Sequence, residues 1–363
     1  MEQKKFRIGI IGCGGIANGK HMPSLKALSS ECEMVAFCDL IIGRAEKAKA
    51  DFGTPDAKVY TDYRELLKDE TIDVIHVCTP NKSHAPISIA ALEAGKNVMC
   101  EKPMAKTAAE AKQMLEAAKR TGKTLTIGYQ NRQATNMQLV KKMAEDGVFG
   151  KIYYGKALAL RRRAVPTWGV FLNEEEQGGG PLIDIGTHAL DLTLWTMNNY
   201  EVESVTGNVH YELRGRENAA NAWGPWDPAK YTVEDSAFGF IKMKNGATII
   251  LESSWAINLA DTREAQYVLA GTEAGVDFVD GVRINGEEYS RLYTKNVDLK
   301  KGGVAFYDGS AGDSPALAEA RQWLKSLREG TAPCVLPEQA LVVSQILEAI
   351  YESYKTGKTI YFN

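Results

Sequence analysis

Short apolar runs alternate with amphipathic stretches along the first third of the chain. The apolar runs predict strands over residues 7–11, 34–38, 73–78, 97–100 and 124–128. Between these runs the apolar residues recur at helical spacing, which predicts helices that end near residues 28, 52, 94 and 121. Strands that alternate with helices in this way predict crossover connections and a parallel sheet with helices on both faces.

The pattern changes beyond about residue 150. Longer strand-like runs cover 151–163, 203–213, 235–243 and 247–255, and Asn245-Gly246 between the last two is a strong hairpin signal. Residues 313–328 and 337–356 have the pattern of helices, and a helix over about 132–145 connects the two halves. We therefore predict two domains, residues 1–128 and 129–363. The second is expected to be an open-faced, mostly antiparallel sheet with flanking helices.

Composition and charge narrow the class of protein. The 363 residues include 43 Lys and Arg against 46 Asp and Glu, a formal charge of −3 without any basic tract, so no nucleic-acid or membrane partner is expected. The start of the chain has neither the apolar core nor the cleavage site of a secretory signal. The six cysteines have no metal-binding spacing and are expected to be reduced thiols. These features predict a soluble cytoplasmic protein.

A glycine-rich turn follows the first predicted strand and opens the first helix. Its sequence is Gly12-Cys13-Gly14-Gly15-Ile16-Ala17. Gly12 permits the tight turn, Gly14 lets a pyrophosphate approach the backbone, and Ala17 permits close packing of helix on strand. Asp39 ends the second strand, where a carboxylate accepts hydrogen bonds from both ribose hydroxyls and repels the 2′-phosphate of NADP. We therefore expect NAD as the cofactor. Arg44, about a helical turn beyond Asp39, is a feature that favours NADP instead, because an arginine there can accommodate the 2′-phosphate.

Two further motifs follow predicted strands. One is Thr79-Pro80-Asn81 with His84 a turn later, and the other is Glu101-Lys102-Pro103. Ligands of open α/β sheets bind outside these strand ends, so the first motif predicts cofactor contacts and Lys102 is placed to stabilise negative charge on a reacting oxygen. Helix capping by Asn81 and Ser83 and a solvated His84 are the structural alternatives.

A third motif has a different form. Gly178-Gly179-Gly180-Pro181 runs into an amphipathic helix on which Asp184, His188 and Asp191 share one stripe. His188 is a candidate general base whose orientation Asp184 supports. The alternative makes Asp184 a helix N-cap and His188 a packing residue. No further His or Cys spacing supplies metal ligands, so no metal is expected.

The Glu101-Lys102-Pro103 motif together with the Gly178–His188 pattern resembles the glucose–fructose oxidoreductase/inositol dehydrogenase (Gfo/Idh/MocA) family. The likeness extends over essentially the whole chain, including VEDSAFGFIKMKNGATIILESSW. It implies an N-terminal Rossmann domain and an open-faced sheet domain for substrate binding and homo-oligomerisation. It implies Lys102, Asp184 and His188 as catalytic residues. The cofactor residues expected from the motifs and the resemblance are Gly12, Gly14, Gly15, Ile16, Ala17, Asp39, Thr79, Pro80, Asn81, His84, Glu101, Lys102 and Gln130.

A narrower likeness is carried by the segments 128–132 and 161–171. These resemble gut-bacterial enzymes that oxidise the C3 hydroxyl of glucosides, including C-glucosides. Tyr129, Arg132, Arg162, Trp168 and Phe171 are the expected substrate contacts, although core packing accounts for Trp168 and Phe171 equally well. The function implied is NAD-dependent oxidation of a glucoside at C3. An inositol or free-sugar dehydrogenase, an NAD-dependent glycosidase and a dinucleotide-sensing regulator without chemistry are the alternatives.

Overall fold

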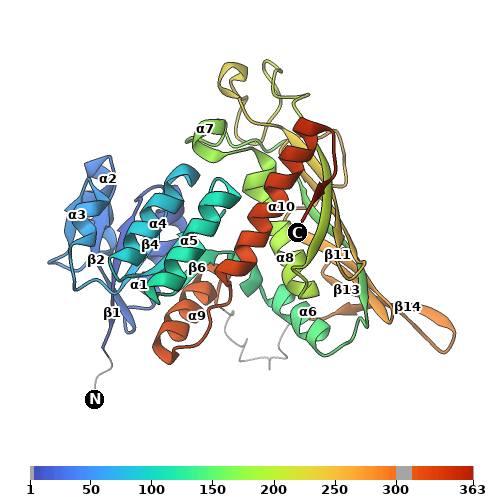
Figure 1. Cartoon of the computed structure of the whole chain (residues 1–363), viewed down its shortest axis with the longest axis horizontal. Helices are drawn as coiled ribbons and strands as arrows, with labels where there is room; N and C mark the ends of the chain where they lie inside the picture. The colour runs from blue at the N-terminus through green and yellow to red at the C-terminus, as the bar shows by residue number, and fades with distance from the viewer. Residues whose placement is uncertain (1–3, 300–312, 363) are drawn as a thin grey trace, which may run out of the picture. The chain divides into compact units, whose positions relative to one another are not determined.

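The structure is a computed structural model that describes residues 4–299 and 313–362. It divides into two compact units, which are described separately (Figure 1). The first unit comprises the described part of Met1–Gln130 together with Asp313–Ser344, and the second comprises the described parts of Asn131–Gly312 and Gln345–Asn363. The expected boundary at 128/129 lies within two residues of the first crossing, but the helix expected at 313–328 belongs to the first unit instead of the second.

The first unit contains a six-stranded sheet in the order β3-β2-β1-β4-β5-β6, with parallel pairing throughout. The strands are β1 (Phe6–Ile11), β2 (Cys32–Cys38), β3 (Lys58–Tyr60), β4 (Val74–Val77), β5 (Asn97–Glu101) and β6 (Leu125–Gly128). This order confirms the predicted Rossmann fold, in which the chain reverses direction across the sheet between β1 and β4. The carboxyl ends of the strands therefore form one edge at which ligands bind.

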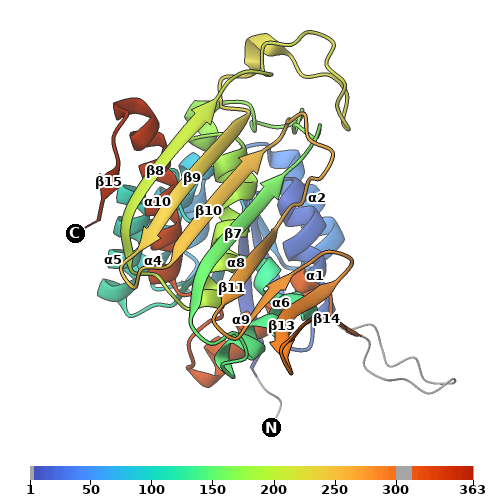
Figure 2. The ribbon, with the colours of Figure 1, turned by 90° about the vertical axis from the view of Figure 1, so that its right-hand side faces the viewer.

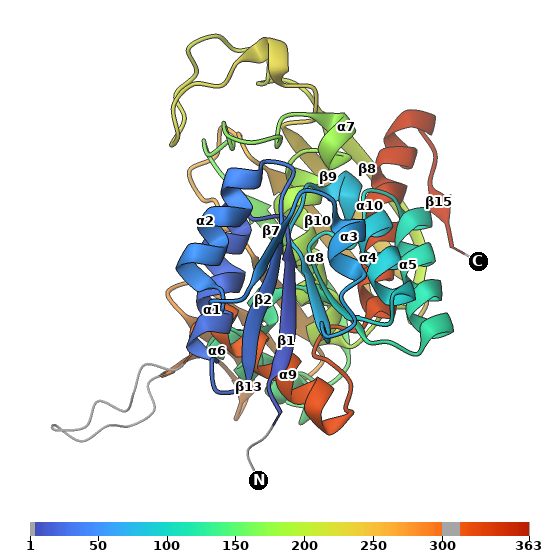
Figure 3. The same cartoon turned by 90° about the vertical axis from the view of Figure 1, so that its left-hand side faces the viewer.

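Helices cover both faces of this sheet. They are α1 (Met22–Ala27), α2 (Ile42–Phe52), α3 (Tyr63–Leu67), α4 (His84–Glu93), α5 (Ala108–Thr121) and α9 (Pro315–Glu329), with the short turns η2 (Asn81–Ser83) and η3 (Gln130–Gln133). Figure 3 shows α1 and α2 on one side of β1 and β2, and α4 and α5 on the other. Trp323 and Leu324 of α9 are completely buried in the core that α1, β1 and β2 form, which explains why this late helix belongs to the first unit.

The predicted helix to residue 28 contains a π-helical turn near its start, η1 (Ala17–His21), that leads into α1. The N–H of Met22 donates to the carbonyl of Ala17, five residues earlier. Pro23 has no N–H and cannot complete the ordinary α-helical ladder, which favours a local change of helix type at this point.

The second unit contains a nine-stranded sheet in the order β14-β13-β12-β11-β7-β10-β9-β8-β15. The strands are β7 (Ile152–Leu160), β8 (Val202–His210), β9 (Ser236–Met243), β10 (Thr248–Ser254), β11 (Gln266–Gly271), β12 (Ala274–Asp277), β13 (Val282–Glu288), β14 (Arg291–Val297) and β15 (Ile360–Tyr361). The pair β7 and β10 is parallel and the other pairs are antiparallel, as predicted, and the Asn245-Gly246 hairpin joins β9 to β10. Figure 2 shows this sheet with one face toward the viewer.

The helices of the second unit are α6 (Thr135–Glu145), α7 (Glu174–Gln177), the π-helical η4 (Leu182–Gly186), α8 (Thr187–Met197) and the turn η5 (Pro228–Lys230). The helices α6 and α8 pack against β11 to β13 through a core that includes Tyr267 and Trp195. The helix α10 (Pro337–Thr356) begins in the first unit and continues into the second. The helical segment that carries Asp184 and His188, η4 with α8, packs on β10 and β7 of this sheet.

Candidate active site

The glycine-rich turn has the geometry that a dinucleotide requires. Gly12 has φ +90°, and a Cβ there would lie 2.6 Å from the carbonyl oxygen of Cys78, so no other residue fits. A Cβ at Gly14 or Gly15 would meet nothing within 4 Å, which leaves the backbone N–H groups open to a ligand. Ala17 is completely buried at the start of η1. The open backbone of this turn and the buried Ala17 are features that the pyrophosphate of a dinucleotide needs.

Asp39 is held against this turn. One of its carboxylate oxygens accepts the N–H of Cys13 and the other accepts the N–H of Ile41, both at 2.9 Å. Leu40 is 91% exposed beside it, and Ile16 on the turn is also exposed. An anionic acceptor flanked by exposed apolar side chains suits an adenosine with free ribose hydroxyls, which is the NAD form.

His84 is buried, which excludes the solvated alternative. Its Nδ1 lies 2.8 Å from the carbonyl oxygen of Pro103 and its Nε2 lies 2.9 Å from that of Thr79. Burial lowers the pKa of His84, against the two carbonyl contacts, which favour the protonated ring. The imidazole therefore joins the turn after β4 to the turn after β5, which contains Lys102 and Pro103. Asn81 is also buried, and the side chain of Ser83 does not cap α4.

Glu101, directly before Lys102, lies in a buried ionic network. Its Oε1 accepts hydrogen bonds from Lys20 Nζ and from His21 Nε2, both at 2.7 Å, and its Oε2 accepts the N–H of Lys102 at 3.0 Å. Lys20 also lies 2.9 Å from Glu319 and donates to Gln130 at 3.0 Å. Burial alone would raise the pKa of Glu101, but Lys20 and His21 hold it well below its usual range. The carboxylate thus fixes the end of β5 that carries Lys102.

In the second unit, Asp184 is the third residue of η4, and the N-cap residue of this helix is Pro181. The expected alternative of an N-cap at Asp184 is therefore wrong. Its Oδ2 accepts a hydrogen bond from the indole N–H of Trp255 at 3.1 Å. Ser253 donates to the carbonyl of Pro181 at 2.8 Å. The π-helical turn contains Asp184 and ends two residues before His188, and such turns are frequent at functional sites.

An aromatic chain leads from solvent to Trp255. Trp168 is 51% exposed and contacts Phe171 and Trp223 edge-on, at centroid separations of 5.8 and 4.8 Å. Phe171 in turn lies 6.5 Å from Trp255, the partner of Asp184. Core packing alone does not account for an indole that is half exposed.

The other expected substrate residues have different surroundings. Arg132 is fully buried and forms a two-point ion pair with Asp191, at 2.9 Å from Nε and 2.6 Å from Nη2. We therefore leave Arg132 out of the proposed substrate contacts. Tyr129 is also buried, whereas Arg162 is exposed.

Several residues that complete these arrangements were missed by sequence reasoning. Lys20 and Glu319 belong to the network around Glu101, while Glu234 and Tyr351 contact the glycine-rich loop before Asp184. Charged residues in a helical pattern are assigned to the solvated face by default. Glu234 offered a signal, because two consecutive acids begin a strongly apolar strand.

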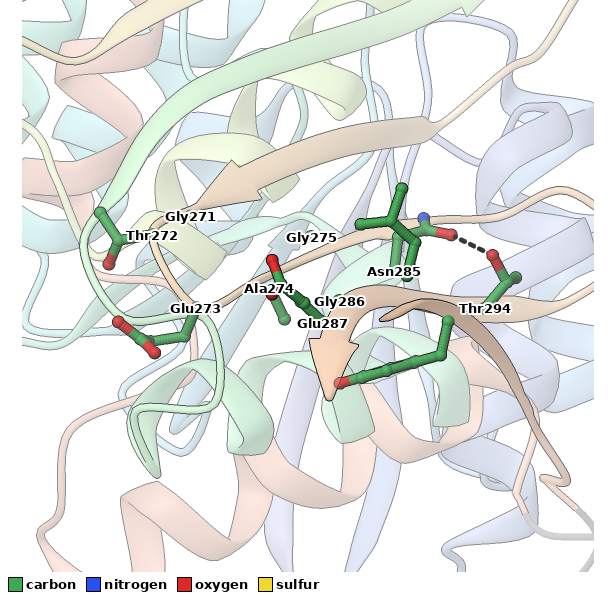
Figure 4. A pocket seen from close by; sticks show the side chains of 11 residues that line it. Gly271, Thr272, Glu273, Ala274, Gly275, Asn285, Gly286, Glu287 and Thr294 are labelled. Atoms are coloured by element: carbon green, nitrogen blue, oxygen red, sulfur yellow. Dashed lines mark hydrogen bonds between the residues drawn. The ribbon is translucent and has the colours of Figure 1, made fainter. Parts of the chain in front are cut away.

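A shallow pocket of about 440 Å³ lies elsewhere in the second unit (Figure 4). Its lining comes from the ends of β11 to β14, and Thr294 donates to Asn285 across it at 3.0 Å. None of the expected catalytic, cofactor or substrate residues lines this pocket. It offers no acid–base pair near a helix terminus, and we do not assign the active site to it.

Comparisons with known proteins identify the family. Residues 6–129 match the family model for the oxidoreductase family with an NAD-binding Rossmann fold, and residues 137–277 match the Gfo/Idh/MocA C-terminal domain. The chain is 34% identical to the D-glucoside 3-dehydrogenase of Escherichia coli (strain K12), over 99% of this chain and 98% of that protein.

Solved structures show the same fold. An oxidoreductase domain protein from Kribbella flavida is similar with a TM-score of 0.85 at 23% identity, over 99% of this chain and all of that one. A levoglucosan dehydrogenase in complex with NADH has a TM-score of 0.83 at 22% identity and the same coverage. From the family models and the full-length relative, the chain belongs to the Gfo/Idh/MocA family of oxidoreductases, and its first domain is an NAD-binding Rossmann fold.

Proposed function

We propose that this protein is an NAD-dependent dehydrogenase that oxidises the C3 hydroxyl of glucosides to the 3-keto-glycoside. The observation that carries the proposal is the edge of the first sheet. The glycine-rich turn, Asp39 and Lys102 follow β1, β2 and β5 at the carboxyl ends of parallel strands, where a dinucleotide and a reacting carbon are expected. The full-length likeness to a D-glucoside 3-dehydrogenase supports the choice of substrate.

The cofactor is held by the N–H groups of Gly14 to Ala17 and by the Asp39 carboxylate in this proposal. NAD supplies the hydride acceptor when bound. The exposed backbone of the turn and the buried Ala17 meet the needs of the pyrophosphate and of the helix behind it. Thr79, Pro80 and Asn81 follow β4, next to β1 in the sheet, and contribute the remaining contacts at the strand ends.

The chemistry is assigned to three side chains. His188 removes the proton from the substrate hydroxyl, since imidazole accepts a proton near neutral pH. The Lys102 ammonium donates to the same oxygen and stabilises its developing negative charge. Asp184, oriented by Trp255, stabilises the imidazolium that forms.

The experiment that tests these roles compares His188→Ala and Lys102→Met with the native protein. We expect each variant to bind NAD normally, by calorimetry, and to lose at least about 100-fold in kcat, since general acid–base catalysis contributes about that much. A His188→Ala enzyme that turns over glucosides at the native rate would contradict the assignment.

Trp168 and Phe171 are proposed to bind the glucoside. The faces of indole and phenyl rings suit the apolar face of a pyranose or an apolar aglycone. The exposure of Trp168 and the unbroken ring contacts to Trp255 support this use of the aromatic chain. Turnover of inositols or free sugars in preference to glucosides would refute this substrate assignment but not the proposed dehydrogenase activity.

Homo-oligomerisation and a cytoplasmic location are proposals as well. Phe240 of β9 is half exposed on the nine-stranded sheet, which supports association through that sheet. In the residues that the structure describes, no helix is long and apolar enough to span a membrane. Light scattering after gel filtration tests the assembly, and a monomer at micromolar concentration would refute it.

A further inference from the structure

Three hydrogen bonds converge on the buried carboxylate of Glu234, which lies just before β9. Its Oε2 accepts the N–H of Gly180 at 2.8 Å, and its Oε1 accepts the N–H of Leu182 at 3.1 Å. The hydroxyl of Tyr351, on α10, donates to the same Oε1 at 2.8 Å. Glu234 and Tyr351 therefore hold the loop that leads into the helix of Asp184 and His188.

The glycines of this loop are explained by the same contacts. A Cβ at Gly179 would collide with the Tyr351 hydroxyl, and a Cβ at Gly180 would collide with the backbone carbonyl of Glu234. The two residues must therefore lack side chains for Glu234 and Tyr351 to reach the backbone. Two glycines of the triplet, Gly179 and Gly180, are thus required because Glu234 and Tyr351 pack directly against the backbone there.

Opposing electrostatic effects act on this carboxylate, whose pKa is raised overall by burial. Leu182 is the first residue of η4, which continues directly into α8, so the carboxylate faces the N-terminal end of a helix that runs to Met197. The N–H groups and positive dipole end of a helix stabilise a negative charge. Burial raises the pKa of Glu234, and the hydrogen bonds from Gly180, Tyr351 and Leu182 oppose this.

We propose that Glu234 and Tyr351 are positioning residues for the dehydrogenase reaction. They act through the π-helical turn η4: by fixing its first residues, they set the orientation of Asp184 and, one turn later, of His188. Three segments far apart in the sequence meet at this one carboxylate. Ser253 and Trp255 hold the other side of the same turn, through Pro181 and Asp184.

The inference rests on the proposed function, because it needs His188 to be the base. A displacement of a catalytic group by about 1 Å costs about 100-fold in rate. We call the hydrogen bonds of Glu234 and Tyr351 to the glycine-rich loop and to each other the clamp. The clamp lies within the second unit, whereas the residues proposed to bind NAD belong to the first. Loss of the clamp should therefore lower kcat and leave NAD affinity intact, a separation that a general loss of folding does not produce.

The experiment uses Tyr351→Phe and Glu234→Gln in the full-length protein, with Tyr354→Phe as the matched control. Tyr354 lies on the same helix, is 42% exposed and packs against Tyr211. Tyr351→Phe removes one donor and keeps both backbone hydrogen bonds. Glu234→Gln removes the charge. It also replaces one accepting carboxylate oxygen by an amide NH₂ group, which can only donate and therefore faces a backbone N–H donor without a hydrogen bond.

We expect kcat with a glucoside to fall about 3- to 10-fold in Tyr351→Phe and about 10- to 100-fold in Glu234→Gln, with the dissociation constant of NAD within about twofold of native. The isotope effect on kcat with a C3-deuterated glucoside should rise in both, because hydride transfer becomes the slow step. Tyr354→Phe should behave as native.

A native kcat in both variants would overturn the inference, and so would an equal loss of NAD affinity and kcat. Tyr351→Phe keeps the test decisive if Glu234→Gln does not fold, since it leaves the carboxylate and its backbone bonds in place. His188→Ala is measured alongside. Activity retained in His188→Ala refutes the proposed function, whereas an inactive His188→Ala beside unaffected clamp variants refutes the clamp alone.

Discussion

Lys20 allows a quantitative test of the buried network in the first unit. Its ammonium lies 2.7 Å from Glu101 and 2.9 Å from Glu319, and all three side chains are at most 9% exposed. We predict that Lys20→Met, which keeps the bulk of the side chain but removes its charge, lowers the free energy of unfolding by about 3–5 kcal/mol at pH 7.5. This is the cost of leaving buried charges without their partner.

The pH dependence of this loss has a defined sign. Despite burial, Lys20 and His21 hold the pKa of Glu101 below its usual 4.5, so in the native protein its contribution to stability is present above pH 4.5 and is lost as the pH falls. Burial raises the pKa of Glu319 in spite of Lys20, so its contribution is lost as the pH rises. The two effects oppose one another in the native protein.

Without Lys20, burial raises the pKa of both carboxyl groups. The folded variant then binds one proton more than the unfolded chain between the usual carboxyl pKa and the raised one. Its stability should therefore recover by about 1.4 kcal/mol for each unit by which the pH is lowered from 7.5 toward 5.5. The native protein should gain less over the same range, because there only Glu319 has a raised pKa.

The assay is urea unfolding followed by far-ultraviolet circular dichroism at several pH values in this range. Lys47→Met is the matched control, because Lys47 pairs with Asp51 on the exposed face of α2 and an exposed pair is worth at most about 1 kcal/mol. A Lys20→Met midpoint equal to that of the control, or a pH slope equal to the native one, would refute the reasoning.

Three further predictions concern the cofactor, the fold and the substrate. Asp39→Ser should raise KM for NAD about tenfold and increase the ratio of NADP to NAD use, through loss of a charged acceptor; an unchanged ratio in steady-state kinetics would count against the ribose contact. Arg132→Met should cost about 3–5 kcal/mol of unfolding free energy, because it strands the buried Asp191 carboxylate, whereas a native urea midpoint would show that the pair is dispensable. Trp168→Ala should raise KM for glucosides about tenfold with the NAD dissociation constant unchanged, since ring stacking and burial are lost; an unaltered KM would remove Trp168 from the substrate site.

Strand and helix periodicity was enough to predict five of the six strands of the first sheet, because these strands are mostly buried and glycine or a turn ends several of the helices. It missed β3, a three-residue edge strand without a buried side chain. It also predicted β7 to β10 and the Asn245-Gly246 hairpin. It missed β11 to β14, where short strands expose polar residues; β14 is exposed over most of its length. Such strands are defined by their neighbours more than by their own pattern.

The candidate site shows the same division. Gly12 was predictable because a tight turn at that place demands glycine. The ribose contact of Asp39 stays a prediction. Lys20, Glu319 and Tyr351 were not predictable, since their roles depend on partners 81, 299 and 117 residues away, a separation that no local pattern encodes. Arginine is a residue type that contacts substrates, but the guanidinium of Arg132 is paired with Asp191.

The central claim is tested most directly by mixing the purified protein with NAD and a panel of glucosides, inositols and free sugars. The measurement is the absorbance of NADH at about 340 nm, with the product identified by mass spectrometry. The account predicts NADH formation concentrated on glucosides, a product two hydrogens lighter with its carbonyl at C3, and no signal from His188→Ala. Oxidation at another carbon, or a preference for inositols, would contradict it.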